Sequence, residues 1–184
     1  MKKQLRGRKL VIWWGVALVV CAGAAIAAGW LKPRLLDSAQ KRLAVSEMYY
    51  EYKQKFPDVI DIRPEEAIQL LGEGNVIFVD DREPKERAVS TIPGAISADD
   101  LREHPEQYSG KTLIVYCTIS YRSGKLAEEY GPKYGLVMKN MIGGILGWVH
   151  AGGPIVDPSG RPVLRVHVYG PTWDLAPDGY ETVW

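Results

Sequence analysis

The amino-acid sequence predicts an α/β fold with a parallel sheet flanked by helices on both faces, preceded by one transmembrane helix. Short apolar strands alternate with helical patterns through the middle of the chain, which is typical of a parallel sheet. The clearest strands, residues 76–80 and 112–116, are nearly continuously apolar, as expected for strands buried on both faces. An uncharged run over residues 11–31 predicts the transmembrane helix.

The elements of this sheet follow one another in a regular order. Pro64 favours a helix start, and the Gly-Pro pair at residues 131–132 favours a helix end. Strands are expected at residues 59–62, 76–80, directly after the turn at 92–95, 112–116 and 136–141. Helices are expected at residues 64–71, 84–88, 99–106, 125–130 and 143–151. In such sheets, active sites lie beyond the carboxyl ends of the strands.

The chain divides into five parts that differ in composition. Residues 58–156 hold the alternating strands and helices and form the predicted domain. Before it we predict a basic cytoplasmic tail, a membrane anchor or uncleaved signal, and an amphipathic linker helix, at residues 1–10, 11–31 and 32–57. Residues 157–184 form a tail rich in Pro and aromatic residues, with one exposed strand expected at 163–169. We assign no chemical role to this tail.

The linker carries apolar side chains at helical spacing between residues 37 and 56. These are Val45, Met48, Tyr49, Tyr52 and Phe56. Because such a stripe is typical of a packing face, we expect a helix that docks on the domain.

Residues 11–31 match a bilayer in length and in their flanking residues. A helix of this length spans about 30 Å, the thickness of the hydrocarbon layer. Trp13, Trp14 and Trp30 lie near its ends, where aromatic residues gather at membrane interfaces. Basic residues precede it, so the positive-inside rule places the N-terminus in the cytoplasm and the domain outside, in the periplasm of a bacterium. These residues are Lys2, Lys3, Arg6, Arg8 and Lys9.

Two other interpretations of this segment stay open. Ala25-Ile26-Ala27 offers a cleavage site for a signal peptide, although the apolar region of such peptides is usually shorter. Cys21 offers a lipoprotein site, although Val20 is bulkier than the small residue expected before it. The anchor is the preferred interpretation.

The charge distribution excludes some classes of partner. Residues 1–36 hold seven Lys or Arg and no acids, whereas the remainder holds 16 basic and 22 acidic residues, a net charge of −6. Nucleic-acid-binding domains normally present a basic face, so no nucleic-acid partner is predicted. His104, His150 and His167 are scattered and distant in sequence from the cysteine of the domain, so we predict neither a metal site nor a cofactor.

Cys117 is the candidate catalytic residue. It follows a strand and precedes a helical pattern, so its thiol lies among free backbone N–H groups at the positive end of a helix. Arg122 adds positive charge nearby, and this setting favours the nucleophilic thiolate. A lone cysteine is more often a small buried apolar residue. Against that interpretation, Cys117 lies after the strand and is flanked by Thr, Ser and Arg.

Residues 58–156 resemble the rhodanese family of sulfurtransferases in three stretches. Residues 79–84 followed by 90–95 are similar to the family signature D-x-R-E-P … G-H-I-P-G-A. Residues 115–123 resemble the active-site loop, and residues 140–148 resemble the closing stretch N-L-x-G-G-x-x-x-W. The stretches occur in the family's order, whereas the tail and the residues before Asp58 lie outside the resemblance.

The resemblance implies sulfur transfer without a cofactor. The Cys117 thiolate attacks the outer sulfur of a small donor (thiosulfate, a polysulfide or a persulfide) and passes it on to a thiol or cyanide acceptor. Backbone N–H groups of the loop and one guanidinium bind the anionic substrate, which implies binding roles for Thr118, Ile119, Ser120, Tyr121 and Arg122. Supporting roles are implied for Asp80, Arg82 and Ser123, and for the first two a structural ion pair is expected.

Loop length separates this prediction from a cysteine-dependent phosphatase. Those enzymes use five residues between Cys and Arg, whereas four separate Cys117 from Arg122, and the smaller ring suits a single sulfur atom. The chain also departs from the family pattern. Ser120 stands where glycine is common, and Thr91, Arg87 and Ile142 replace a usual histidine, aromatic and polar residue.

These departures keep two other functions open. One is a non-catalytic rhodanese-like scaffold at the membrane, whose protein partner the sequence does not identify. The retained thiol and Arg122 argue against it, because a scaffold needs neither. The other is a thiol redox sensor, which would need a mixed disulfide because no resolving cysteine lies near Cys117.

Overall fold

The computed structural model of the chain describes residues 36–184. The predicted basic tail at residues 1–10 and the predicted anchor at residues 11–31 lie outside the described residues. Among the helices of residues 36–184, none combines the length and apolar character that a bilayer span requires.

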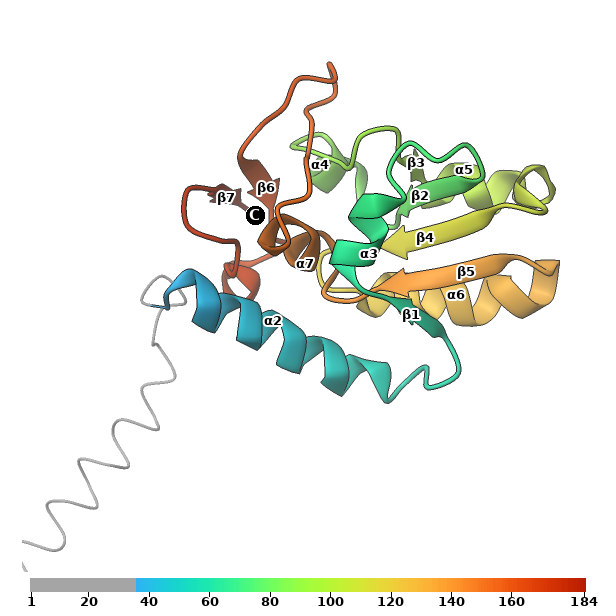
Figure 1. Cartoon of the computed structure of the whole chain (residues 1–184), viewed down its shortest axis with the longest axis horizontal. Helices are drawn as coiled ribbons and strands as arrows, with labels where there is room; N and C mark the ends of the chain where they lie inside the picture. The colour runs from blue at the N-terminus through green and yellow to red at the C-terminus, as the bar shows by residue number, and fades with distance from the viewer. Residues whose placement is uncertain (1–35) are drawn as a thin grey trace, which may run out of the picture.

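The centre of the domain is a five-stranded sheet in which all neighbouring strands are parallel (Figure 1). Its spatial order is β1-β5-β4-β2-β3, and the strands are Ile60–Ile62 (β1), Val76–Asp80 (β2), Ile96–Ser97 (β3), Thr112–Tyr116 (β4) and Val137–Met141 (β5). The last residues of β2 and β4, Asp80 and Tyr116, are register partners. Cys117 therefore emerges beside Asp81 at the carboxyl edge of the sheet.

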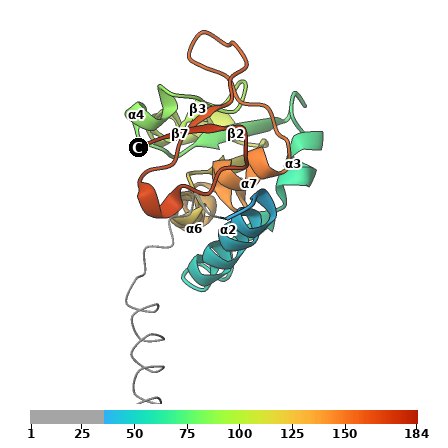
Figure 2. The ribbon, with the colours of Figure 1, turned by 90° about the vertical axis from the view of Figure 1, so that its left-hand side faces the viewer.

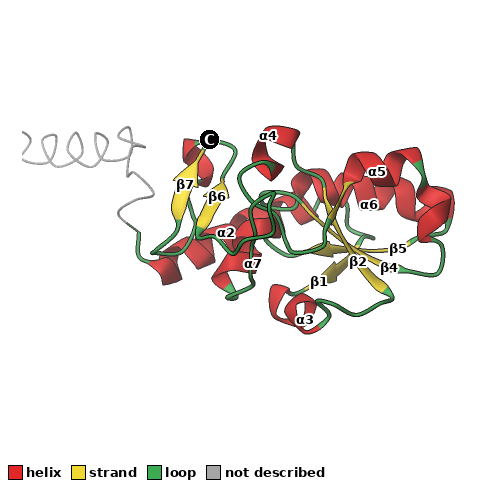
Figure 3. Ribbon diagram, turned by 90° about the horizontal axis from the view of Figure 1, so that it is seen from above, coloured by secondary structure: helices red, strands yellow, loops and turns green. Residues whose placement is uncertain are grey.

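Helices cover both faces of the sheet, as predicted. They are α3 (Pro64–Gln69), α4 (Pro84–Arg87), α5 (Ala98–Glu103), α6 (Tyr121–Tyr134) and α7 (Gly144–His150). Alternate residues of β4 enter different cores: Ile114 joins the cluster with α3 and α7, and Val115 joins the cluster with α5 and α6. Figure 3 shows α3 on one side of the sheet and α5 and α6 on the other.

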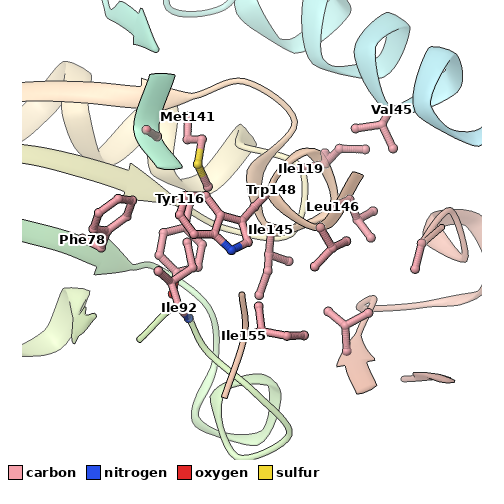
Figure 4. Close-up of a cluster of buried hydrophobic side chains, with 14 of the residues drawn as sticks. Val45, Phe78, Ile92, Tyr116, Ile119, Met141, Ile145, Leu146, Trp148 and Ile155 are labelled. Carbon is pink, nitrogen blue, oxygen red and sulfur yellow. The ribbon is translucent and has the colours of Figure 1, made fainter. Parts of the chain in front are cut away.

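Trp148 of α7 lies at the centre of the larger core (Figure 4). Its ring is fully buried and packs edge-to-face on Phe78, with 5.4 Å between ring centroids. Its indole N–H donates to the carbonyl of Pro154 at 2.8 Å, so the buried polar atom is satisfied. This hydrogen bond holds the segment after α7 against Trp148.

The linker forms helix α2 (Ser38–Lys53), which confirms the predicted helix. Asp37 and Gln40 form a capping box at its start. Val45 and Tyr49 are buried, and the helix packs beside α7 and α6 (Figure 2). Phe56, just beyond its end, is also fully buried. The predicted docking face is therefore the buried face.

The tail differs from its prediction. A strand does form at Arg165–His167 (β6), but it pairs in parallel with Glu181–Val183 (β7) instead of standing alone. Val166 and Val168 are buried in the larger core, so the strand expected at 163–169 is not an exposed one. The polar residue between them, His167, is buried as well, so both sides of this stretch pack on the protein.

Two predicted helix bounds are wrong for local reasons. Helix α6 begins four residues earlier than predicted and passes Pro132 to end at Gly135, whose φ of 64° provides the left-handed cap. Pro132 lies in the last turn, where its missing N–H costs a single intrahelical bond. The helix predicted at 99–106 divides before Pro105 into α5 and a 3-10 helix, Pro105–Tyr108 (η2), because proline disfavours helical geometry in the preceding residue.

Gly124 is the point where α6 meets the segment after α2. A Cβ on Gly124 would lie 2.4 Å from the ring of Phe56. Gly124→Ala should lower the free energy of unfolding by about 1–2 kcal/mol, because overpacking outweighs the better helix propensity of alanine. Chemical denaturation measures this change. Gly131→Ala in the same helix is the control, since a Cβ there meets the Leu136 carbonyl at an ordinary 3.6 Å. Equal stability changes in the two variants would contradict the proposed contact.

Candidate active site

The loop from Cys117 to Ser120 joins β4 to α6 at the carboxyl edge of the sheet. The Cys117 side chain is buried, and the backbone N–H of Ser120 donates to its Sγ at 3.2 Å. The first turn of α7 supports the loop from behind, because Ile145 N donates to the Cys117 carbonyl at 2.9 Å. A Cβ on Gly144 would lie 2.3 Å from that carbonyl, so only glycine permits this approach.

Ser120 adopts a left-handed backbone conformation with φ of 74°. This conformation costs a residue with a Cβ about 1–2 kcal/mol. The Ser120 hydroxyl donates to the Met141 carbonyl at the end of β5, and Asn140 Nδ2 donates to the Ser120 carbonyl at 3.0 Å. Ser123 Oγ donates to Asn140 Oδ1 at 2.8 Å, so this predicted supporting residue orients the asparagine. Hydrogen bonds to β5 thus hold the serine where the family pattern has glycine.

Arg122 makes a bidentate ion pair with Glu86 of α4. Its two terminal nitrogens lie 2.8 and 3.0 Å from the carboxylate oxygens of Glu86, which is fully buried. Thr118 Oγ1 donates to the same carboxylate at 2.9 Å. Sequence reasoning missed Glu86, because an acid inside a short polar helix carries no local signal of its burial.

The ion pair shifts the pKa of both partners toward their charged forms. Burial opposes the charge on Arg122, but the hydrogen bond to Glu86 and the charge of a Cys117 thiolate outweigh burial and raise the pKa of Arg122. Burial raises the pKa of Glu86, but hydrogen bonds from Arg122 and the Glu83 N–H outweigh it, so the pKa of Glu86 is lowered. Both groups are charged at neutral pH.

A pocket of about 500 Å³ opens above the thiol. Five of the predicted site residues line it: Cys117, Thr118, Ile119, Tyr121 and Arg122. Ser120 is fully buried and is not among the lining residues. The remaining lining residues are Tyr52, Lys55, Tyr169 and Trp173, which sequence reasoning did not place at the site. They come from the end of α2 and from the tail, and no local pattern relates those segments to Cys117.

Asp80 and Arg82 form a buried ion pair outside the pocket lining. Arg82 Nε and a terminal nitrogen lie 2.9 and 2.7 Å from the two carboxylate oxygens of Asp80. Thr91 and Tyr116 donate their hydroxyl groups to the same carboxylate at 3.0 and 2.8 Å. This is the structural ion pair expected of these residues, and Thr91 is one of its hydrogen-bond donors.

The described residues contain no cluster of three or more metal-binding side chains. His150 and His167 lie on different elements, and each bonds to backbone. His150 Nε2 donates to the Leu175 carbonyl, and His167 Nδ1 accepts from the Tyr169 N–H. These are packing and capping roles.

Comparison with known proteins identifies the domain. The family described as "Rhodanese-like domain" matches residues 63–151. An uncharacterized protein of Synechocystis, slr1261, is 34% identical over 107 residues, which cover 56% of this chain. The aligned region spans only 60% of that relative. Residues 63–151 therefore form a rhodanese-like domain.

The chain is also similar to proteins of known structure. A thiosulfate sulfurtransferase from Pseudomonas aeruginosa is 25% identical with a TM-score of 0.50, and the match covers 55% of this chain and 20% of that one. The BH2092 protein from Bacillus halodurans is 24% identical with a TM-score of 0.48, covering 62% of this chain and 87% of that one. The family includes sulfurtransferases and also members without catalytic activity.

Glu86→Gln tests the ion pair, because it removes the charge and keeps the shape. At pH 7 the free energy of unfolding should fall by about 1–3 kcal/mol. The pKa of Glu86 is lower in the folded protein than in the unfolded chain, where it is about 4.3. The charged carboxylate therefore stabilises the fold above about pH 4.3, and this stabilisation is lost as the pH falls through the pKa of the folded protein. The difference between the wild type and Glu86→Gln should therefore shrink toward pH 3.

Chemical denaturation at a series of pH values measures this difference. Glu106→Gln is the control, since its side chain is 72% exposed and should change stability little at any pH. A Glu86→Gln difference that stays constant from pH 7 to pH 3 would contradict the ion pair.

Proposed function

We propose that the protein is a sulfurtransferase that moves sulfane sulfur from thiosulfate, a polysulfide or a persulfide to a thiophilic acceptor through a Cys117 persulfide. The observation that carries this proposal is the position of Sγ below a pocket that contains Arg122, with the Ser120 N–H directed at the sulfur. Donor and persulfide are both anions, so this setting favours each of them.

The reaction balances without a cofactor or an oxidant. The Cys117 thiolate attacks the outer sulfur of thiosulfate with its electron pair and forms a new S–S bond. The old S–S bond breaks, and its electron pair leaves with sulfite. Cyanide or a thiolate then attacks the outer sulfur of the persulfide, which releases thiocyanate or an acceptor persulfide and restores the Cys117 thiolate. Each step conserves charge.

The loop favours sulfur transfer over phosphate chemistry. Four residues lie between Cys117 and Arg122, and the Ser120 N–H is already directed at Sγ. A ring of this size suits one transferred sulfur atom, whereas a tetrahedral phosphate needs more donors around it. The alternative function, a non-catalytic scaffold, would need neither the Cys117 thiol nor the positive charge of Arg122 beside it.

We also propose that residues 11–31 anchor the enzyme in a membrane, with its N-terminus in the cytoplasm and its domain on the other side. The support is the uncharged run, its flanking Trp residues and the basic residues before it. The domain would then act on sulfur compounds outside the cytoplasm.

Cys117→Ser should abolish sulfur transfer. The full chain, purified in detergent, should form thiocyanate from thiosulfate and cyanide, and Cys117 should gain the mass of one sulfur atom on exposure to polysulfide. Cys21→Ser is the matched control and should stay active, because it removes the only other cysteine. Thiocyanate formation by Cys117→Ser would remove the proposal. A wild-type chain that gains no sulfur would favour the scaffold.

The membrane proposal predicts that the full chain stays in the membrane fraction after extraction with alkaline carbonate and retains residues 1–31 in its intact mass. Protease added outside the cytoplasmic membrane should digest the domain, because the proposal places the domain on that side. An intact mass that lacks the segment up to Ala27 would show signal cleavage and overturn the anchor.

A further inference from the structure

The pocket above Cys117 is completed by segments outside the rhodanese-like domain. Four of its nine lining residues lie outside residues 63–151, and these are Tyr52, Lys55, Tyr169 and Trp173. Trp173 is the last residue of a short 3-10 helix of the tail, Pro171–Trp173 (η3). The family's loop therefore supplies the chemistry, while this chain's own flanking segments supply much of the pocket wall.

The wall is built from two edge-to-face aromatic pairs. Tyr52 from α2 packs on Tyr121, with 5.2 Å between ring centroids. Tyr169 and Trp173 from the tail pack on each other at 5.3 Å. A pocket with four aromatic rings offers apolar faces and edges on which a flat ligand stacks.

The tail rings are held in place before any ligand arrives. Tyr169 has a left-handed backbone with φ of 70°, an unfavourable conformation for a bulky residue. Its N–H donates to His167 Nδ1 at 3.0 Å, and its ring lies over the Arg122 guanidinium at 5.3 Å. Strain at a residue that faces a site is a reason to look for a function there.

The charged residues that line the pocket, Lys55 and Arg122, are both cations. Lys55 Nζ lies over the Tyr121 ring at 5.2 Å, and no carboxylate of residues 36–184 forms a salt bridge with it. Because Arg122 is already paired with the buried Glu86, Lys55 is the lining cation that remains available to an anion in the pocket. The pocket volume of about 500 Å³ is that of a site for a small organic molecule, and it is far larger than the handful of atoms in thiosulfate.

We propose that the pocket selects sulfur donors that join an anionic sulfane-sulfur group to a flat apolar body, such as aryl thiosulfonates. This inference rests on the proposed sulfur transfer and concerns its substrate class. Tyr52, Tyr169 and Trp173 are the specificity-determining residues, and they contact the apolar body. Lys55 attracts the anionic group into the pocket, while Arg122 stays paired with Glu86 beside Cys117.

The transfer from an aryl thiosulfonate is balanced. The Cys117 thiolate attacks the terminal sulfur and forms the S–S bond of the persulfide. The bond between that sulfur and the sulfonyl sulfur breaks, and its electron pair leaves with the aryl sulfinate. One anion and one thiolate become one sulfinate and one persulfide anion, so no oxidant or reductant is needed.

The test compares benzenethiosulfonate with methanethiosulfonate, which share the reacting group and differ in the body. With the full chain in detergent and cyanide as acceptor, kcat/KM should be at least about tenfold higher for the aryl donor. Trp173→Ala and Tyr169→Ala should each reduce this preference by about threefold to tenfold, mainly through KM. Tyr169→Phe keeps the ring and should restore the preference relative to Tyr169→Ala.

Trp184→Ala is the matched control, since this tail tryptophan is 59% exposed and is not among the lining residues. Near-equal kcat/KM for the two donors would overturn the inference, and so would a preference that survives both alanine variants. In either case, activity with thiosulfate would leave the proposed function intact. Absence of thiocyanate with every donor would instead overturn the proposed function itself. Denaturation curves for each variant separate a lost preference from a lost fold.

Discussion

The ion pair between Glu86 and Arg122 is the interaction on which the arrangement of the site depends. A buried carboxylate costs several kcal/mol unless it is paired and hydrogen-bonded. Glu86 meets this requirement with the Arg122 guanidinium, the Thr118 hydroxyl and the Glu83 N–H. Because Glu86 follows β2 while Arg122 and Thr118 follow β4, the ion pair holds the Cys117 loop against the end of the neighbouring strand.

Hydrogen bonds from the other neighbouring strand complete this support. The Ser120 backbone is bonded to β5 through the Met141 carbonyl and the Asn140 amide. The loop is thus held from both sides, by β5 and by the α4 segment, and this support offsets the left-handed conformation of a residue with a side chain. A serine at position 120, where the family commonly has glycine, is therefore compatible with a backbone N–H directed at Cys117 Sγ.

The flanking segments are coupled to each other as well as to the domain. Lys41 of α2 forms an ion pair with Asp178 of the tail at 2.8 Å, and Ser38 Oγ accepts a hydrogen bond from Asp178 N at 2.9 Å. These exposed contacts contribute little energy singly, but they join the two segments that carry Tyr52 and Trp173. The two segments that carry the aromatic walls of the pocket are therefore joined directly to each other.

Local signals in the sequence determined the sheet and the position of Cys117 directly after β4. Strands β2 and β4 have the predicted bounds, because apolar runs ended by turns are read without knowledge of the rest of the chain. The ion pair of Arg122 with a residue 36 positions away, and the approach of Trp173 to Cys117, were decided only by the tertiary structure. Burial and charge pairing depend on which distant segments the fold brings together, and neither produces a periodic pattern in the sequence.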